Sequence, residues 1–508
     1  MGSRGAGDVR RADRDGGRGE RGRWGRDRRV SADTPPQTRL PLGLKLFHGL
    51  GSVAYGVKDN GFSTFLLIFY SQVVGLDASL VSLALMFALL ADAFVDPLIG
   101  YFSDRTYTRW GRRHPWLYLA PLPLGLAWML LWSPPDDHTH IFAYLVVVAV
   151  LVRTLVSCCE VPSQSLVAEL TSDYDERTAL VRFRFLFAWG GGLLVFFLAN
   201  TVFLRADATH KFGQLNPSGY WLYGLCGALI MGVTVIVSAL GQHRRVAHLP
   251  ATKPPRSSPK QAFAEIWESL RHPAALILLG ASLIAISSTQ MTFTISNFLY
   301  LYVWRFSEGA FAALPWLLMI SVVMSFVMVQ PLHHRFGKKK VAVVCGVIST
   351  IFWTVPFALF LSGHWPATGS SFSSNLLMAF ILVSNVNAVM VMISGQSMLA
   401  DVVEASQVET GRRTEGIFAA GWMFVQKCAT AVGIGLTGLL ISLSGLPAKA
   451  VPGEVAPQIV DRLVISYSLI VIVATILSAW AFSRFPINRA DHEARLAALA
   501  ASEAAGLQ

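Results

Sequence analysis

The stretch Val81–Gly100 reads VSLALMFALLADAFVDPLIG and places two aspartates inside an otherwise apolar run. Asp92 and Asp96 are four residues apart, so a helix would carry both carboxylates on one face. A charged side chain near the centre of a bilayer costs at least about 2.5–3.5 kcal/mol, and such residues therefore face the protein interior or a watery cavity. We expect this pair to be central to function, because closely spaced carboxylate oxygens suit a small hard cation or a proton.

The composition of the whole chain predicts a membrane protein. Of its 508 residues, 53% are hydrophobic and only 14% are charged, whereas a soluble domain carries about 25% charged residues. Twelve apolar segments are present, each close to the roughly 20 residues that cross a hydrocarbon layer. Backbone polar groups cannot stay unpaired in lipid, and the length of the segments favours helices over the strands of a closed barrel. We predict an all-α membrane protein with twelve transmembrane helices, which begin near residues 44, 79, 115, 140, 182, 218, 275, 310, 340, 373, 416 and 460.

Lysines and arginines are concentrated in alternate loops. If the N-terminus is cytoplasmic, the predicted inner loops hold most of these residues and the outer loops hold only four. This asymmetry follows the positive-inside rule, so we predict that both termini are cytoplasmic. The net charge of +11 then reflects membrane topology and a basic tail, and it does not indicate nucleic-acid binding. The four outer residues are Arg205, Lys211, Arg305 and Lys449.

The predicted helices fall into two bundles of six. Residues 41–241 hold the first bundle and residues 274–485 the second, and the Pro-rich, basic segment 242–273 is the expected cytoplasmic linker. A short basic loop with a glycine follows the second helix of each bundle, as a duplicated six-helix unit would leave. Residues 486–508 are expected to be a cytoplasmic tail.

The first 40 residues differ from the rest of the chain. Residues 1–40 are rich in Arg, Gly and Asp, which predicts a disordered basic tail. Three interpretations stay open: contact with anionic lipid, an inert tail, or a mis-assigned start with Val30 as the true initiator.

Further ionisable residues lie within predicted helices. Lys58 and Asp59 fall in the first half of the first helix, and Lys427 stands in an apolar stretch of the eleventh. In the fourth helix, Ser157 and Glu160 are three residues apart and share a face. So many charged groups cannot all face lipid, and the simplest arrangement is one polar cavity shared by the two bundles.

These residues occur in motifs that resemble a known family. The motifs are Tyr-Gly-x-Lys-Asp from Tyr55, Asp-x-x-x-Asp-Pro-x-x-Gly from Asp92, and Val-Pro-x-x-Ser-Leu-Val from Val161. They are similar to motifs of the melibiose permease family of cation-coupled glycoside–pentoside–hexuronide symporters, within the major facilitator superfamily. Arg-Trp-Gly-Arg from Arg109 and Ala-Asp-Val-Val-Glu from Ala400 add to the likeness. The resemblance implies the major facilitator fold and alternating access between two bundles.

The resemblance also implies roles for individual residues. In that family, oxygens from the second and fourth helices hold the cation, and neighbouring side chains line the sugar site. The implied cation ligands are Asp92, Asp96, Ser157 and Glu160. The implied substrate site comprises Lys58, Asp59, Glu160, Gln164, Arg184, Met392 and Lys427. The implied gating residues, near the inner ends of helices, are Asp104, Arg105, Arg112, Arg177, Asp401, Arg412 and Arg413.

Three positions depart from the family's pattern. Gln164 and Met392 stand where aromatic platforms are expected, and Phe185 stands where the family has a sugar-binding arginine, with Arg184 beside it. Sugars are usually held by aromatic faces combined with bidentate polar contacts, so the archetypal galactoside is disfavoured. A different glycoside, a uronide, a sugar derivative or a more apolar solute stays open.

The sequence therefore predicts a secondary active transporter in the plasma (inner) membrane. A cation, Na⁺ or H⁺, would neutralise Asp92, Asp96 and Glu160 and raise the affinity for a glycoside or other sugar, and linkage makes this effect reciprocal. One alternative is a transporter of lysolipid or another amphiphilic solute, and another is a non-transporting sensor with a transporter fold. At the residue level, Asp92 and Asp96 could instead form a purely structural ion pair with Lys427.

Other classes of function lack support in the sequence. No nucleophile–base set or catalytic metal motif is present, so we expect neither an enzyme nor a cofactor. The five cysteines lie in predicted membrane segments without ligand spacing, which argues against disulfides and zinc. Gly433–Gly438 matches a dinucleotide fingerprint by letters but follows no strand, and it is set aside. Gly190–Gly192 is most simply a place of close helix packing. We expect a monomer in the lipid bilayer, whose partners are a small solute and a coupling cation.

Overall fold

The structure is a computed structural model that describes residues 40–135, 138–171, 173–207, 210–247, 273–410 and 415–486. All of these residues belong to one compact unit that begins at Leu40. They form helices joined by short connections, with no β-strand among them, and the all-α prediction is confirmed. The predicted basic tail, most of the predicted linker, and both Arg412 and Arg413 lie outside the described residues.

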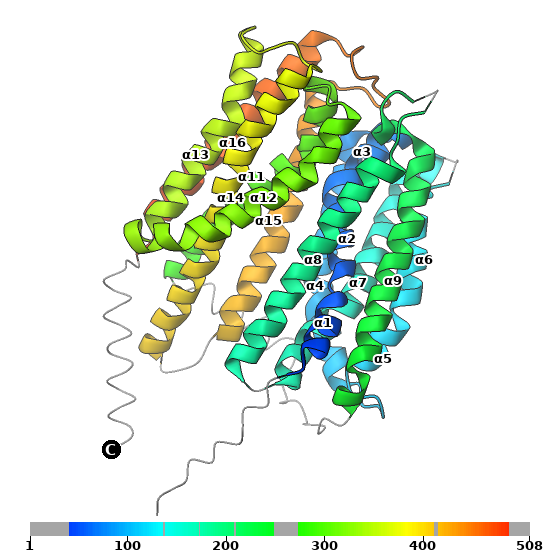
Figure 1. The fold of residues 1–508 in the computed structure, drawn as a ribbon, viewed down its shortest axis with the longest axis vertical. Helices are drawn as coiled ribbons and strands as arrows, with labels where there is room; N and C mark the ends of the chain where they lie inside the picture. The colour runs from blue at the N-terminus through cyan, green and yellow to red at the C-terminus, as the bar shows by residue number, and fades with distance from the viewer. Residues whose placement is uncertain are drawn as a thin grey trace, which may run out of the picture. The chain divides into compact units, whose positions relative to one another are not determined.

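Ten helices in the described part of the chain are long and apolar enough to cross a membrane. They coincide with ten of the twelve segments predicted from the sequence, and Figure 1 shows these helices lying side by side along much of their length. The elements are α1 (Leu42–Leu50), α2 (Val53–Asn60), η1 (Gly61–Phe65), α3 (Leu66–Ile68), η2 (Phe69–Val74), α4 (Ala78–Arg105), α5 (His114–Leu119), α6 (Pro121–Leu131), η3 (His138–His140), α7 (Ile141–Leu170), α8 (Tyr174–Leu198), η4 (Ala199–Phe203), η5 (Gly213–Leu215), α9 (Pro217–Ala247), α11 (Pro273–Phe298), η6 (Leu299–Val303), α12 (Glu308–Phe336), α13 (Lys338–Leu361), α14 (Ser371–Thr410), α15 (Glu415–Ser444) and α16 (Pro457–Ser483).

The other two predicted spans are helical but interrupted. In the first, a turn at residues 51–52 separates α1 from α2. The π-helical segments η1 and η2 follow α2 and α3, and this widened form is rare and often found at functional sites. The third is divided into α5 and α6 at Ala120, directly before Pro121, which has no backbone N–H to donate. The described chain therefore holds ten candidate spans, two of which end in the π-helical segments η4 and η6, and a total of twelve crossings stays a prediction.

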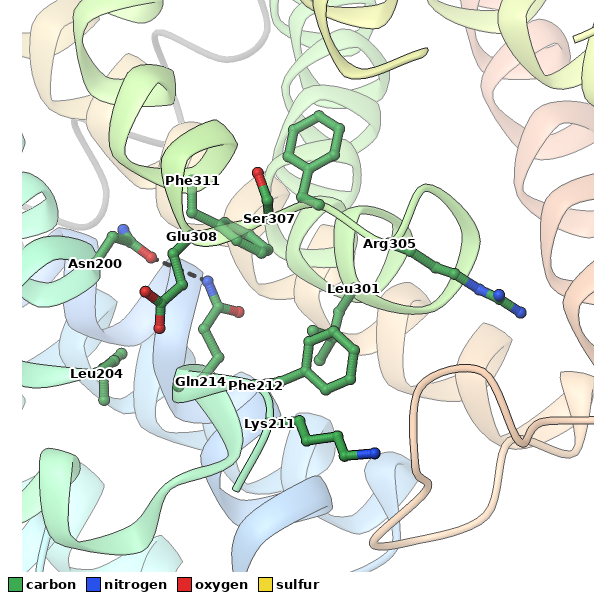
Figure 2. Close-up of a pocket in the computed structure, with 12 residues that line it drawn as sticks. Asn200, Leu204, Lys211, Phe212, Gln214, Leu301, Arg305, Ser307, Glu308 and Phe311 are labelled. Atoms are coloured by element: carbon green, nitrogen blue, oxygen red, sulfur yellow. Dashed lines mark hydrogen bonds between the residues drawn. The ribbon is translucent and has the colours of Figure 1, made fainter. Parts of the chain in front are cut away.

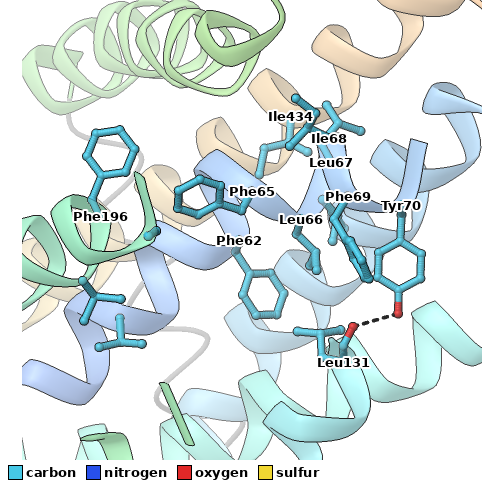
Figure 3. Close-up of a cluster of buried hydrophobic side chains, with 14 of the residues drawn as sticks. Phe62, Phe65, Leu66, Leu67, Ile68, Phe69, Tyr70, Leu131, Phe196 and Ile434 are labelled. Carbon is cyan, nitrogen blue, oxygen red and sulfur yellow. Dashed lines mark hydrogen bonds between the residues drawn. The ribbon is translucent and has the colours of Figure 1, made fainter. Parts of the chain in front are cut away.

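A buried aromatic cluster packs the interrupted first span against its neighbours (Figure 3). The ring of Phe65 is fully buried and lies 5.7 Å from that of Phe196, beside the end of α8. The Tyr70 hydroxyl donates to the carbonyl of Leu131 in α6 at 3.0 Å. Ile434 of α15 belongs to the same cluster. Because burying one large apolar side chain contributes roughly 1.5–3 kcal/mol, this cluster fixes the first span between α6, α8 and α15.

The end of the structure that holds the predicted outer loops, called the outer end below, is closed by hydrogen bonds between the two predicted bundles. The Tyr302 hydroxyl lies 3.0 Å from Gln72 Oε1 and 3.0 Å from the Ala450 carbonyl, so it donates to either acceptor. The Ala450 N–H donates to the same Gln72 oxygen at 3.0 Å. The Asn297 amide donates to the Thr64 carbonyl at 2.8 Å. These contacts hold the outer ends together in the state that the structure represents.

Glycines bring helices together at two further places. A Cβ added to Gly438 of α15 would lie 2.0 Å from Ser82 Oγ of α4, so the two backbones approach closely. A Cβ added to Gly192 of α8 would lie 3.0 Å from the Gly56 carbonyl oxygen of α2. Such small-residue contacts are typical of membrane helices. The predicted close packing is confirmed at Gly192, whereas Gly190 faces open space.

Candidate functional site

Asp92 is a buried carboxylate at the centre of a group of charges from α4, α7 and α15. It lies on α4 with 4% of its surface exposed. Its Oδ1 accepts a hydrogen bond from Ser157 Oγ at 2.7 Å, and its Oδ2 lies 3.0 Å from Arg153 Nη2 and 2.9 Å from Lys427 Nζ. A buried carboxylate is tolerated only when it is paired and hydrogen-bonded. Asp92 meets that condition through donors from α7 and α15.

Asp96, one turn further along α4, is bound less completely. Its Oδ2 forms a close ion pair with Lys427, which therefore bridges both aspartates. Its Oδ1 is buried and has no hydrogen-bond partner among the described residues. Pro97 follows directly, and because proline has no N–H, the carbonyl of Ala93 receives no helical hydrogen bond from it. The side-chain oxygen Asp96 Oδ1 and the backbone carbonyl oxygen of Ala93 are thus left without their usual hydrogen-bond donors.

A second group of charges lies between α2 and α7. Lys58 Nζ is 2.7 Å from Asp59 Oδ1 and 3.9 Å from Glu160 Oε2. The Lys58 side chain is 9% exposed, whereas that of Asp59 is 66% exposed and that of Glu160 is 36% exposed. The structure therefore brings these three predicted substrate residues together, with the lysine at the buried side.

Three further predicted substrate residues lie on α7, α8 and α14. Arg184 of α8 donates to Ser163 Oγ at 2.7 Å, and its guanidinium lies 5.6 Å from the centre of the Tyr55 ring. Gln164 and Met392 are exposed on α7 and α14. Arg184 thus lies close to the helix that carries Lys58, whereas Gln164 and Met392, two of the three positions that depart from the family pattern, offer no ring surface.

Arg153 is a central residue of this site that the sequence prediction missed. Besides its bond to Asp92, its guanidinium lies 5.1 Å from the centre of the Phe62 ring, and the residue is 6% exposed. The signal was present, because an arginine inside an apolar segment is costly and marks a functional or paired position. Arg153, Ser157 and Glu160 also recur at four- and three-residue spacing on one face of α7.

Two predicted gating residues of the first bundle, Asp104 and Arg112, belong to an ion-pair network that includes Arg113. Arg113 forms a close ion pair with Asp104, and its Nε lies 3.0 Å from Glu169 Oε1. Arg112 reaches the same Glu169 oxygen at 2.8 Å. Arg113 is 4% exposed, so it lies at the centre of this network. The sequence prediction named Arg112 and Asp104 but missed Arg113 and Glu169, since adjacent arginines cannot be ranked without the fold.

The other described gating residues divide into one ion pair and two arginines that bind backbone. Asp401 Oδ1 lies 2.5 Å from Lys338 Nζ, which joins α14 to the start of α13. Arg105 and Arg177 donate to backbone carbonyls of nearby residues at 3.3 and 2.9 Å. Each predicted bundle therefore has a carboxylate–cation pair near the loop that follows its second predicted helix.

Long apolar helices with paired acids and bases buried between them define a transporter-type membrane protein. Residues 47–489 match the profile of a family described as MFS/sugar transport protein. The chain belongs to this family, and the predicted resemblance to its symporters is confirmed. The protein is accordingly a multi-pass membrane transporter and not an enzyme.

Individual relatives differ in what they carry. The isoprimeverose transporter of Lactiplantibacillus pentosus is 23% identical, over 89% of this chain and 90% of its own. The sodium-dependent lysophosphatidylcholine symporter 1 of Gallus gallus is 24% identical, over 89% of this chain and 87% of its own. Among solved structures, a D-xylose–proton symporter superposes with a TM-score of 0.60 at 15% identity, over 88% of this chain and 98% of its own. At this identity the structural match shows the fold alone.

Proposed function

We propose that the protein couples the movement of a cation, Na⁺ or H⁺, to the transport of a glycoside or related sugar. The observation that carries this proposal is the contrast between the two aspartates of α4. Asp92 is saturated by three donors, whereas Asp96 has one oxygen on Lys427 and one buried oxygen without a partner. A buried acceptor that lacks a donor costs about 1–3 kcal/mol, and a bound cation or proton would remove that cost.

The cation would bind at Asp96, and Asp92 would act as an anchor between helices. Among the described residues, no group of three or more His, Cys, Asp or Glu is close enough to hold a metal ion. A transported Na⁺ would therefore need neutral oxygens as well, as hard cations accept. Two backbone carbonyls are suitable cation ligands: that of Ala93, four residues before Pro97, and that of Cys158, four residues before Pro162. Neither receives a helical hydrogen bond from the proline, because proline has no N–H.

The substrate would bind beside Lys58, Asp59 and Glu160. Alternating cations and carboxylates can donate to and accept from neighbouring hydroxyls of a sugar, as bidentate pairs do. Tyr55 adds an aromatic ring beside Arg184.

Coupling would follow from Lys427 and Glu160. When a cation occupies Asp96, Lys427 is no longer needed there and its ammonium becomes available to the substrate. Glu160 contacts Lys58 at 3.9 Å and lies on the same face of α7 as the Asp92 ligands, so it can respond to both ligands. Cation and substrate would then raise each other's affinity, as linkage requires. The bundles would rock about this site and open the inner and outer ends alternately.

An amphiphilic substrate is the second candidate. It is supported by the lysophosphatidylcholine symporter among the relatives and by Gln164 and Met392, which provide no aromatic face for a sugar. An alkyl chain would require an apolar path from the charged group toward lipid, next to these residues.

A solute panel in proteoliposomes separates the two candidates. Purified protein is reconstituted, and an inward Na⁺ or proton gradient is imposed with a set of radiolabelled glycosides and with lysophosphatidylcholine. The sugar proposal expects gradient-driven uptake of at least one glycoside and none of the lysolipid. Uptake of the lysolipid alone supports the second candidate and refutes the first.

A further inference from the structure

The two cations that contact Asp92 come from different predicted bundles. Asp92 lies on α4 and Arg153 on α7, both in the predicted first bundle, whereas Lys427 lies on α15 in the predicted second bundle. When the bundles rock in the proposed cycle, Arg153 therefore moves together with Asp92, and Lys427 moves relative to both. The charge of Asp92 thus keeps one counter-charge throughout that cycle.

The Arg153 guanidinium is a buried and permanent charge. Its Nη2 donates to Asp92 Oδ2 at 3.0 Å, and the centre of the buried Phe62 ring is 5.1 Å away on another side. The Arg153 side chain is 6% exposed, compared with 25% for that of Lys427. A guanidinium does not lose its proton in proteins, so burial cannot neutralise it. Such a costly group inside an apolar helix requires a functional explanation.

The contact supplies charge more than directional bonding. Arginine frequently offers a carboxylate two parallel N–H groups. Arg153 instead reaches Asp92 through Nη2, while its buried Nε has no hydrogen-bond partner among the described residues. Asp92 Oδ1 is bound separately by the Ser157 hydroxyl at 2.7 Å. Carboxylate and hydroxyl oxygens are ligands that a hard cation accepts, so Na⁺ is a natural replacement for the guanidinium at this place.

Na⁺ finds few free oxygens while Arg153 is present. Both oxygens of Asp92 already accept hydrogen bonds, and one oxygen of Asp96 is paired with Lys427. The two carboxylates are also balanced by two cations, Arg153 and Lys427. A hard metal ion needs several oxygens at once, but a proton needs one. Asp96 Oδ1, which is buried and lacks a partner in the described helices, meets that smaller need.

We propose that Arg153 determines the ion selectivity of the site, as a tethered counter-ion that keeps Na⁺ away from Asp92 and leaves H⁺, bound at Asp96, as the coupling ion. This inference rests on the proposed function and narrows its cation to one. Loss of the Arg153 charge should open a Na⁺ site formed by Asp92 and Ser157. Arg153 is then a positioning residue that acts on the cation through Asp92.

Selectivity of the wild type is tested in the proteoliposome panel described above. An inward proton gradient should drive solute uptake, and an inward Na⁺ gradient at equal pH on both sides should not. Uptake driven by Na⁺ alone in the wild type would overturn this inference and leave the proposed function intact. Absence of uptake with either gradient would refute the proposed function, and the unfolding measurements below would still decide the role of Arg153.

The Na⁺ site is tested by unfolding, which needs no substrate. Purified full-length Arg153→Gln and wild type are unfolded in mixed micelles, with Na⁺ replacing choline at constant ionic strength. Raising Na⁺ from about 1 to about 100 mM should shift the unfolding equilibrium of Arg153→Gln about tenfold or more toward the folded state, and that of the wild type less than about twofold. Equal shifts would overturn the inference. Failure of Arg153→Gln to fold at the higher Na⁺ concentration would also contradict it, because Na⁺ should replace the lost charge.

Three variants locate the effect. Arg153→Lys keeps the charge and should respond to Na⁺ as the wild type does. Arg153→Gln/Asp92→Asn leaves no uncompensated buried charge, so it should fold, but it should lose the response because the carboxylate is absent. Arg182→Gln, at an exposed position of α8, is the matched control for the loss of one arginine. A Na⁺ response that persists in Arg153→Gln/Asp92→Asn would show that Na⁺ binds elsewhere and that the assignment is wrong.

A cavity of about 170 Å³ at the outer end is a competing place for Na⁺ (Figure 2). Asn200, Gln214 and Glu308 are among its lining residues, and no member of the acid cluster lines it. Its carboxylate, Glu308, accepts from the Ala206 N–H at 2.8 Å. The Na⁺ response of Arg153→Gln should therefore persist in Arg153→Gln/Glu308→Gln. Its loss there would place Na⁺ at the outer cavity and refute the assignment to Asp92.

Discussion

Replacing Arg153 by methionine tests the arrangement around Asp92. Arg153→Met removes one charge-assisted hydrogen bond at 3.0 Å, worth about 1.5–3 kcal/mol. It also removes the stacking of the guanidinium at 5.1 Å from the Phe62 ring, worth about 2 kcal/mol when desolvated. The sum of roughly 3–5 kcal/mol equals the usual cost of breaking a buried pair. Because Lys427 still contacts Asp92, we expect the lower end, about 3 kcal/mol, or a hundredfold change in the unfolding equilibrium.

The assay is reversible unfolding in mixed micelles, followed by tryptophan fluorescence. Arg153→Met, Asp92→Asn and the double variant form a cycle that isolates the pair. The double variant should be more stable than Arg153→Met, because no uncompensated buried charge is left. Arg182→Met, an exposed arginine of α8, is the matched control and should change stability by less than about 0.5 kcal/mol. Equal stability of Arg153→Met and Arg182→Met, or additive effects in the cycle, would refute the reasoning.

Two further predictions concern the outer end. In Gly438→Leu, even the Cβ would lie 2.0 Å from Ser82 Oγ, so α4 and α15 must separate there. We expect a loss of at least about 1–3 kcal/mol and a shift toward the outward-open state. The shift is measured as faster labelling, by a membrane-impermeant maleimide, of a cysteine at Ala450, which is 5% exposed in this state and contacts Gln72 and Tyr302 through its backbone alone. Unchanged labelling in folded Gly438→Leu would contradict this. Tyr302→Phe removes the hydroxyl that contacts Gln72 at 3.0 Å, worth roughly 1 kcal/mol, and should raise the same labelling rate about fivefold. Tyr300→Phe is its control, and equal rates in the two variants would show that the Tyr302 hydroxyl does not hold the outer end.

Much of this architecture could be predicted because lipid constrains a sequence strongly. Ten long helices stand where apolar segments of spanning length predict them, since no other backbone arrangement satisfies every polar group in hydrocarbon. The two interrupted spans could not be predicted as such. The π-helical turns near Phe65 and Phe69 depend on tertiary packing rather than on local pattern.

The sequence predicted the acidic residues of the site better than its basic residues. Helical spacing and the cost of buried charge were enough to expect Asp92, Asp96 and Lys427 together, and the structure places them in direct contact. Arg153 carried the same signal and was missed. Arg113 could not have been chosen over its neighbour, because only the packing of the loop between α4 and α5 decides which side chain is buried.

The division into two bundles and the roles of the site residues stay predictions. The contacts between Lys427 and the α4 aspartates fit both a coupling site and a structural ion pair, because each requires the same geometry. The unpartnered oxygen of Asp96 favours the coupling site, since a purely structural pair has no need for a free acceptor.

The most direct test of cation coupling compares substrate accumulation in wild type and Asp96→Asn, with the transported solute identified by the panel above. Proteoliposomes receive an inward cation gradient, and the internal and external solute concentrations are followed to a steady state. The account predicts accumulation above equilibrium in the wild type and only equilibration in Asp96→Asn, while the latter still exchanges internal for external solute. Accumulation by Asp96→Asn to the wild-type level would contradict the assignment of Asp96 as the coupling residue.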